Sequence, residues 1–231
     1  MYKYGQYCPI AKAVEILCDR WTLLIVRDLL TGTEHFNDLE RGLPGISRGL
    51  LADRLRRLQR LELVEKVEVE NGRNRTAYRL TPAGRELQAV IDSLLIWGAR
   101  WAFEAPEENE LDPVLLMWWM RGRVQRDKLP EQQVVVRFDF QGPKNETFWL
   151  LLKREDVSIC LTDPGFDLDL LVTADLSAFF QIWLGRLTFA EAQQANLVEV
   201  DGIPTLAKAL PNWLAYSLAS PAVRAAQQQK S

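Results

Sequence analysis

The sequence is poor in the residues that build disulfide frameworks and metal sites. Its 231 residues include three cysteines, Cys8, Cys18 and Cys160, and a single histidine, His35. An odd number of cysteines without a C-x-x-C pair indicates neither a disulfide framework nor a zinc site. We therefore expect reduced thiols and no metal or other cofactor, with Cys18 and Cys160 buried because they stand in apolar patterns.

Long hydrophobic runs are also missing. The longest, VLLMWWM at residues 114–120, is far shorter than the roughly 20 residues that a membrane-spanning helix needs. No positively charged and then apolar leader occupies the first residues. From these two absences we expect a cytoplasmic protein without a membrane partner, and a hydrophobic content of 48% predicts a sizeable core.

Sequence signatures of enzymes are lacking as well. The chain has no G-x-S-x-G, no phosphate-binding loop, no H-E-x-x-H and no second histidine for a proton relay. Asp167 and Asp169 alternate along one predicted strand, but a pair of acids beside a turn is more typical of a solvated surface than of acid-base catalysis. We predict that the protein is not an enzyme.

Charge is present but unevenly distributed. The chain carries a formal charge of -3, yet residues 1–104 hold 16 Lys and Arg against 14 Asp and Glu, which leaves 12 against 17 for the rest. The stretch EAPEENELDP at residues 104–113 is acidic and bounded by proline, so it packs poorly into a core. We therefore predict a domain at residues 1–103, a linker at 104–113 and a second domain at 114–231.

Helical patterns dominate the N-terminal half. Apolar residues recur at helical spacing behind Pro9, the run WTLLIVRDLLTG at residues 21–32 predicts a buried helix, and FNDLERG at 36–42 predicts a short one. Ser47 is placed to cap the next helix, because its hydroxyl can accept from the free N–H groups of the first turn. Two short helices around a glycine-containing turn are typical of a helix-turn-helix.

The helix after Ser47 has an apolar face and a basic face. Leu51, Leu55 and Leu58 fall on one side, and small and basic residues fall on the other. Small residues let a helix approach base edges closely, while arginine binds phosphate or reads guanine. A solvated amphipathic face is the alternative for a basic helix taken alone. The candidate DNA contacts are Ser47, Arg48, Gly49, Ala52, Arg56, Arg57 and Arg60.

A hairpin and a long helix follow. Residues 63–81 alternate apolar and polar on both sides of Asn71-Gly72, which predicts two antiparallel strands. A helix-turn-helix with such a hairpin is a winged helix, and its tip would bring Arg73 and Arg75 to a minor groove or its phosphates. The predicted helix from Pro82 has more apolar surface than a small domain covers, so we expect a homodimer interface there. Its candidate residues are Leu87, Ile91, Leu94, Trp97 and Trp101.

Several ordered motifs resemble the HxlR-type winged-helix regulators, which are allied to the MarR group. They are CPIAKAVEILCDRWTLLIVRDLLTG, HFNDLERGLPGIS, LLADRLRRL, AYRLTPAG and SLLIWGARW, and they run from Cys8 to Trp101. The resemblance implies a homodimer that binds double-stranded operator DNA through the helix beginning at Ser47 and through the wing arginine that aligns with Arg75. The sequence departs from the family at His35, where an arginine is usual, and at residues 71–74, where a proline pair is usual.

Cys8 stands directly before a predicted helix, where the helix dipole favours the thiolate. Some relatives in the family that the sequence resembles sense oxidants or electrophiles through a cysteine at this position. A small structural residue is the alternative, since no basic side chain is its immediate neighbour. Cys8 is therefore a candidate redox residue.

The C-terminal half predicts an α+β domain. A helix at residues 114–124 is followed by four strands between residues 134 and 174, and then by helices and a short strand up to residue 218. Aromatic residues concentrate here, and they form either a plain core or a ligand cavity. The candidate pocket residues are Phe138, Phe140, Trp149, Phe166, Phe180, Trp183 and Trp213.

The order of these elements resembles the sterol-carrier-protein fold over about residues 134–216. That resemblance implies an α/β sandwich with an apolar tunnel for lipids or fatty acyl groups, and similar domains are found attached to HxlR-like regulators. It implies an apolar small-molecule effector for this domain.

The sequence therefore predicts an α+β protein with a winged helix-turn-helix domain first and a sterol-carrier-like domain second. We expect a homodimeric transcriptional regulator that binds a palindromic operator. The alternative is a carrier of lipids or other hydrophobic ligands whose winged helix serves only dimerisation. Salt-sensitive retention on DNA separates the two.

Overall fold

The computed structural model describes residues 3–70, 74–142 and 145–229. Its contacts divide the chain into an N-terminal unit, residues 1–94, and a C-terminal unit, residues 95–231. This division falls inside helix α6 (Gln88–Trp101), earlier than the acidic stretch at 104–113 where we expected a linker. The reason is that Ala99, in the second half of α6, is buried against Val223 and Ala226 of helix α11 (Ser220–Gln228).

The helices of the N-terminal unit confirm the predicted helix-turn-helix. They are α1 (Pro9–Leu17), α2 (Thr22–Leu30), α3 (Phe36–Gly42) and α4 (Arg48–Arg60). Pro9 occupies the first turn of α1, and the hydroxyl of Ser47 accepts from the amide of Leu50 at 3.3 Å, as expected for a helix cap. One core holds these helices together, and its buried members include Ile25, Val26, Leu39, Leu43, Leu51, Leu55 and Leu58.

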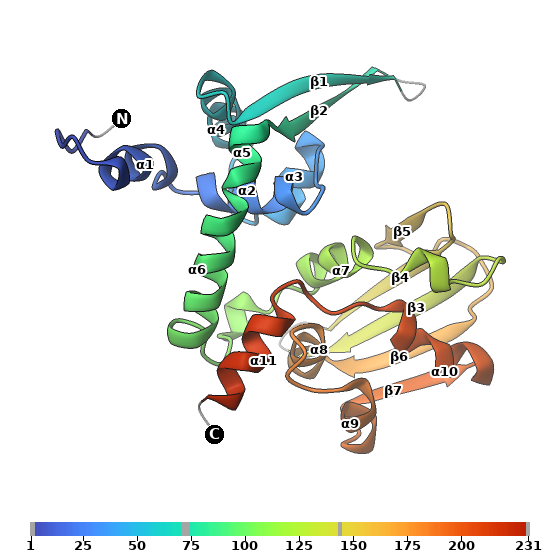
Figure 1. The fold of residues 1–231 in the computed structure, drawn as a ribbon. Helices are drawn as coiled ribbons and strands as arrows, with labels where there is room; N and C mark the ends of the chain where they lie inside the picture. Colours follow the sequence, from blue (N-terminus) through green and yellow to red (C-terminus); the bar gives the residue numbers. More distant parts are fainter. Residues whose placement is uncertain (1–2, 71–73, 143–144, 230–231) are drawn as a thin grey trace. The chain divides into compact units, whose positions relative to one another are not determined.

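The predicted hairpin is present as strand β1 (Val64–Glu70) paired antiparallel with strand β2 (Asn74–Leu80). Figure 1 shows it projecting beyond the helices of the N-terminal unit. The expected turn residues Asn71, Gly72 and Arg73 lie outside the described residues. The segment before α3 joins β2, because the amide of Tyr78 donates to the carbonyl of Glu34 at 2.7 Å and Nδ1 of His35 lies 3.0 Å from the carbonyl oxygen of Thr76.

The long helix predicted from Pro82 is two segments. Helix α5 (Pro82–Glu86) ends before Leu87, which forms a turn, and α6 begins at Gln88. The hydroxyl of Thr81 accepts from the amide of Gly84 at 3.1 Å and caps α5. Gly84 packs against the main chain of Leu63, the residue before β1. An added Cβ at Gly84 would collide with the carbonyl oxygen of Leu63. Only glycine fits at this crossing.

The C-terminal unit is built on a five-stranded sheet in the order β5-β4-β3-β6-β7 (Figure 1). Its strands are β3 (Val134–Gln141), β4 (Glu146–Leu152), β5 (Val157–Cys160), β6 (Leu170–Asp175) and β7 (Val198–Gly202). Neighbours pair antiparallel except β3 and β6, which are parallel. The mixture of helices and sheet confirms the expected α+β class.

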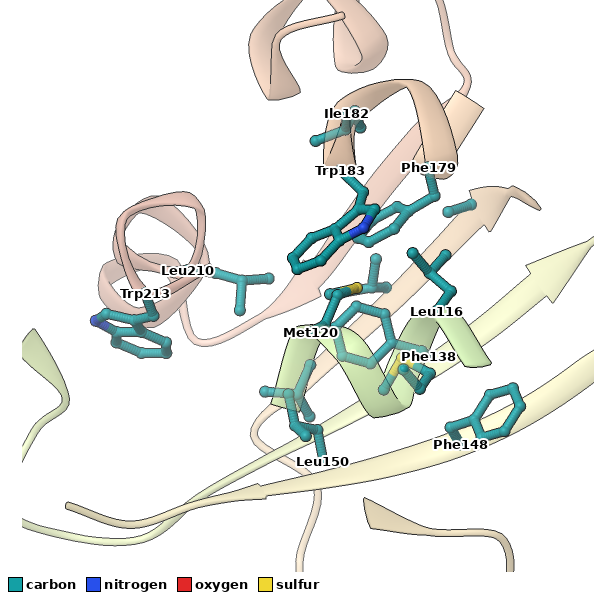
Figure 2. Close-up of a cluster of buried hydrophobic side chains, with 14 of the residues drawn as sticks. Leu116, Met120, Phe138, Phe148, Leu150, Phe179, Ile182, Trp183, Leu210 and Trp213 are labelled. Atoms are coloured by element: carbon teal, nitrogen blue, oxygen red, sulfur yellow. The ribbon is translucent and has the colours of Figure 1, made fainter. Parts of the chain in front are cut away.

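Helices of the C-terminal unit pack their apolar sides onto this sheet. They are α7 (Pro113–Arg121), α8 (Leu176–Trp183), α9 (Phe189–Gln194) and α10 (Pro204–Trp213). Figure 2 shows side chains from α7, α8 and α10 gathered against Phe138, Phe148 and Leu150 of the strands. Two single-turn helices, η1 (Glu108–Glu110) and η2 (Arg126–Lys128), complete the unit.

Three expectations about this half and about the thiols need correction. The elements predicted from the sequence end at residue 218, so helix α11 (Ser220–Gln228) was missed. Cys18 is exposed at the end of α1, and Cys160 is half-buried at the end of an edge strand, so neither is buried.

None of the described helices is long and apolar enough to span a membrane.

We expect Gly84→Ala to destabilise the N-terminal unit by about 1 to 3 kcal/mol, because the new methyl group forces α5 away from the carbonyl of Leu63. Gly49→Ala in α4 is the matched control, since an added Cβ there meets no atom within 4 Å. The control should be neutral or gain up to about 1 kcal/mol from the better helix propensity of alanine. Urea unfolding of both variants measures the difference, and equal stabilities would contradict the close approach at Gly84.

Candidate nucleic-acid interface

The side of α4 turned away from the core is open to solvent. Leu51, Leu55 and Leu58 are at most 2% exposed. Because they bury one stripe of the helix, the opposite stripe has no neighbour to cover it. We call this stripe the outer face of α4, and it comprises Ser47, Arg48, Gly49, Ala52, Asp53, Arg56 and Arg60. Six of these were predicted from the sequence, and Asp53 was missed although the helical period places it there.

The small residues of the outer face leave room for a ligand. An added Cβ at Gly49 meets no described atom within 4 Å, and Ala52 one turn later is only half-buried. Ser47 begins the helix with an exposed side chain that caps the amide of Leu50. The N-terminal half of α4 can therefore lie close to a large flat or grooved surface.

Two arginines of the outer face form exposed ion pairs. Arg56 pairs with Asp53 one turn earlier in α4, and both side chains are more than 60% exposed. Arg48 reaches α3, where it pairs with Glu40, donates to Oδ1 of Asn37 at 3.2 Å and lies 5.0 Å from the ring centroid of Phe36. Exposed pairs of this kind contribute at most about 1 kcal/mol, so a phosphate can replace the carboxylate.

Arg60, at the end of α4, is exposed and forms no ion pair with any described residue. Its guanidinium is thus available to an anionic partner without loss of an existing contact. The helix cap Leu61 follows directly, so Arg60 also stands where a cation is favoured by the helix dipole.

Arg57 lies apart from the outer face, and its sequence-based assignment as a DNA contact stays a prediction. Its side chain is 17% exposed and pairs with Asp19, while Nη2 donates to the carbonyl of Glu15 at 2.8 Å. Arg54 lies beside it and donates from Nε to the carbonyl of Arg20 at 3.1 Å. Helical periodicity places Arg57 at the margin of the outer face. Its side chain turns toward the connection between α1 and α2, where Asp19 pairs with it.

The wing is described only in part. Arg75 lies in β2 opposite Val69, while its side chain and all of Arg73 fall outside what the structure describes. Further along β2, Nε of Arg79 donates to Oε1 of Glu34 at 3.0 Å. This pair joins the hairpin to the segment before α3 and so helps to set the direction of the wing.

Burial raises the pKa of Asp28 in α2, although Nε of Arg27, which donates to Oδ1 at 2.7 Å, acts in the opposite direction. Oδ2 of Asp28 is buried without a hydrogen-bond partner among the described residues. The folded state therefore holds the proton more tightly than the unfolded chain. The stability that follows is fully present below the unfolded pKa and is lost as the pH rises through the folded pKa.

Glu15 in α1 has the reverse shift. The amide of Tyr4 donates to Oε1 at 2.8 Å and lowers the pKa of this carboxyl, against the effect of burial, and Nζ of Lys12 at 3.5 Å acts in the same direction as the amide. The stability from these contacts is present above the unfolded pKa and is lost as the pH falls through the folded one. The hydrogen bond attaches the segment before α1 to the helix.

The candidate dimer residues, Leu87 and four residues of α6, fall into two groups. Leu87 and Ile91 are half-buried and pack on the core of the N-terminal unit. Leu94, Trp97 and Trp101 are 46%, 60% and 64% exposed and follow one another at helical spacing. Large apolar side chains exposed in a row on one helix are typical of an interface.

The candidate pocket residues are mostly packed core. Phe138 and Phe140 are at most 1% exposed, and the ring of Phe179 lies 5.8 and 5.4 Å from their centroids in edge contacts. Phe180, Trp183 and Trp213 are buried as well (Figure 2). Trp149 is half-buried beneath Arg137, and Phe166 is 54% exposed on the loop before β6. The structure does not bring these residues to one cavity.

A small apolar cavity with a volume of about 40 Å³ lies in the C-terminal unit. Ligand pockets usually measure about 300 to 1,000 Å³, so this cavity holds at most a small group without rearrangement. Of the candidate pocket residues only Trp183 lines it. Its walls are Met120, Phe179, Ile182, Trp183, Phe189, Pro211, Leu214, Ala215 and Tyr216.

Cys8 lies at the N-cap position of α1, as the sequence predicted, and is half-buried. Its side chain makes no capping hydrogen bond. Among the described residues, no three His, Cys, Asp or Glu side chains are grouped so that they could hold a metal ion.

Comparison with known proteins concerns the part of the chain that contains α4. Residues 16–106 match the HxlR-like helix-turn-helix family. Over 98 residues the chain is 34% identical to the HTH-type transcriptional regulator YvaP of Bacillus subtilis, a match of 42% of this chain and 91% of that protein. The chain belongs to the HxlR-like helix-turn-helix family.

Two further proteins are similar to this HxlR-like chain. The HTH-type transcriptional regulator MT3179 of Mycobacterium tuberculosis is 44% identical over 89 residues, which is 38% of this chain and about half, 56%, of that protein's length. The solved structure of reduced YodB, a transcriptional regulator from B. subtilis, is 32% identical and covers 42% of this chain and 95% of its own, with a TM-score of 0.38. The HxlR-like match includes the whole outer face of α4 and ends before the sheet of the C-terminal unit.

Proposed function

We propose that the protein is a transcriptional regulator that binds a palindromic DNA operator as a homodimer. The observation that carries this proposal is the outer face of α4, where small residues and exposed arginines lie opposite a buried leucine stripe in the second helix of a helix-turn-helix. Support also comes from relatives in the HxlR-like family that are named HTH-type transcriptional regulators.

In this proposal α4 enters the major groove with its N-terminal half foremost. Gly49 and Ala52 let the helix approach the base edges, and Arg48 and Arg56 exchange exposed carboxylate partners for phosphate or guanine. Arg60 contacts the DNA backbone. Arg73 and Arg75 of the wing reach the adjacent minor groove or its phosphates.

The homodimer forms through the exposed stripe of α6, Leu94, Trp97 and Trp101. A two-fold axis between the α6 helices presents two copies of α4 to two half-sites, about one helical turn of DNA or 34 to 36 Å apart. Two-fold symmetry of the protein then requires a palindromic operator.

Changing Arg56 and Arg60 separately to alanine should weaken operator binding, because each change removes a cation from the outer face. A lost phosphate contact reduces the slope of log affinity against log salt by about 0.9, while a lost base contact costs about 1 to 3 kcal/mol at one operator position. The measurement is fluorescence anisotropy on an operator fragment recovered from genomic DNA with the purified protein.

Arg126→Ala is the control for these two variants. Arg126 is an exposed arginine of the C-terminal unit whose Nη1 donates to the carbonyl of Glu155 at 3.3 Å, and its removal changes the net charge by the same amount. Operator affinity should stay at the wild-type value. If Arg56→Ala and Arg60→Ala behave like this control, α4 does not face the DNA. If the wild-type protein shows no salt-sensitive retention on DNA, the carrier alternative is preferred.

Trp97→Glu should convert the dimer to a monomer, because the new carboxylate would be buried in the apolar contact between the two α6 helices. Sedimentation velocity at micromolar concentration measures the change. Ala89→Glu places the same charge on an exposed position of α6 away from the stripe and should leave the dimer intact. A wild-type monomer at these concentrations would contradict the interface.

For the C-terminal unit we propose a sterol-carrier-like sandwich with an apolar effector in the cavity beside Trp183. An effector acts on DNA binding only if it prefers one arrangement of the dimer. A lipid-sized compound must widen the present volume of about 40 Å³.

Titration with fatty acids, sterol-like compounds and aromatic compounds should change tryptophan fluorescence together with operator affinity, the latter by roughly 5- to 150-fold. Ala215→Phe fills the cavity from its wall and should abolish both responses while wild-type operator affinity is retained. If no compound changes the fluorescence of the wild-type protein, the C-terminal unit has a structural role instead.

A further inference from the structure

Two of the arginines in α4 have side chains that are mostly shielded from solvent. Arg54 and Arg57 have side chains that are 22% and 17% exposed, whereas those of Arg48 and Arg56 are 64% and 66% exposed. All four belong to the same helix. The difference comes from the connection between α1 and α2, which lies beside Arg54 and Arg57 and not beside the outer face.

Asp19 in this connection forms ion pairs with both guanidinium groups. Its Oδ2 pairs with Arg57 and lies 3.8 Å from Nη1 of Arg54. It is the only carboxylate paired with either arginine within the described residues. One negative charge therefore compensates two positive charges at the flank of the helix proposed to bind DNA.

Main-chain carbonyls hold the two guanidinium groups in the same place. Arg57 donates to Glu15, whose carbonyl belongs to the last turn of α1 and lacks a partner in that helix, and Arg54 donates to the carbonyl of Arg20. These bonds do not depend on the charge of Asp19. Replacement of Asp19 by asparagine consequently keeps an acceptor oxygen at the site and removes only the charge.

The compensation matters because any exposed cation near α4 strengthens binding to DNA of every sequence. Each phosphate that a protein neutralises adds about 0.9 to the slope of log affinity against log salt, whatever the bases are. A complex on the operator is fixed by base contacts of the outer face, so arginines on the flank gain little there. A non-specific complex is free to shift and can use them.

We propose that Asp19 is a specificity-determining residue of the DNA-binding surface. It neutralises Arg54 and Arg57 and thereby limits the attraction of α4 to non-operator DNA. This inference rests on the proposed function of α4. It assigns to Asp19 a role that is separate from the contacts of Arg56 and Arg60.

The test compares four full-length proteins on an operator duplex and on a non-operator duplex at several salt concentrations. They are the wild type, Asp19→Asn, the double variant Arg54→Gln with Arg57→Gln, and the combination of all three changes. Asp19→Asn should steepen the salt slope on non-operator DNA by about 0.9 for each arginine whose uncompensated charge neutralises a phosphate, and it should lower the ratio of operator to non-operator affinity. The double variant should keep the wild-type slope, because Arg54 and Arg57 do not bind phosphate in the wild type. The triple variant should keep it as well, because both arginines are absent.

Asp53→Asn is the matched control, since it removes the same charge from the outer face of α4. Its effect on non-operator binding should persist in the background of Arg54→Gln and Arg57→Gln, whereas the effect of Asp19→Asn should disappear there. This difference distinguishes release of the two arginines from a general loss of negative charge.

Two results overturn the role of Asp19. One is an unchanged slope for a folded Asp19→Asn, and the other is a smaller slope for the double variant, which would mean that Arg54 and Arg57 already bind phosphate. If Asp19→Asn does not fold, the slope of the double variant alone decides. A wild-type protein that DNA does not retain even at low salt overturns the proposed function itself.

Discussion

Burial of the leucine stripe of α4 is the constraint on which the N-terminal unit depends. Leu51, Leu55 and Leu58 each stabilise the fold by about 1.5 to 3 kcal/mol when they leave water, and they are nearly inaccessible. Their burial fixes the rotation of the helix about its axis. The outer face then has to point to solvent, and the short loops, the Ser47 cap and the hairpin joined to the segment before α3 hold it there.

Charge in this protein is arranged locally and not by its total. A chain with a net charge of -3 carries five arginines within the thirteen residues of α4. The ion pairs divide four of them into two groups. Arg48 and Arg56 are mostly exposed beside Glu40 and Asp53, while Asp19 and two main-chain carbonyls hold the less exposed Arg54 and Arg57. In the role proposed for Asp19, selectivity for DNA comes from the arginines that this residue neutralises as well as from those that the outer face exposes.

The C-terminal unit shows how dense packing limits the scope for a ligand. Edge contacts of Phe179 with Phe138 and Phe140 fill the space between α8 and the sheet, and the remaining cavity of about 40 Å³ lies at the ends of α7, α8 and α10. Aromatic residues stabilise a core strongly through their large area. A compound larger than this cavity could enter it only by separating packed helices, so its binding would be coupled to a change in structure.

The sequence by itself determined the element types, the Ser47 cap, the hairpin around residues 71–73 and the small and basic character of α4, because these depend on periodicity and on turn chemistry within a few residues. It did not determine the break at Leu87, the helix α11 or the solvent exposure of Cys18 and the partial exposure of Cys160. The aromatic residues read equally as core or cavity from composition. The direction of Arg57 was decided only by Asp19 and Glu15, which stand about 40 residues earlier in the chain. A long, flexible side chain at the margin of a helix face takes the direction of whichever partner the folded chain brings near, and no local pattern encodes that partner.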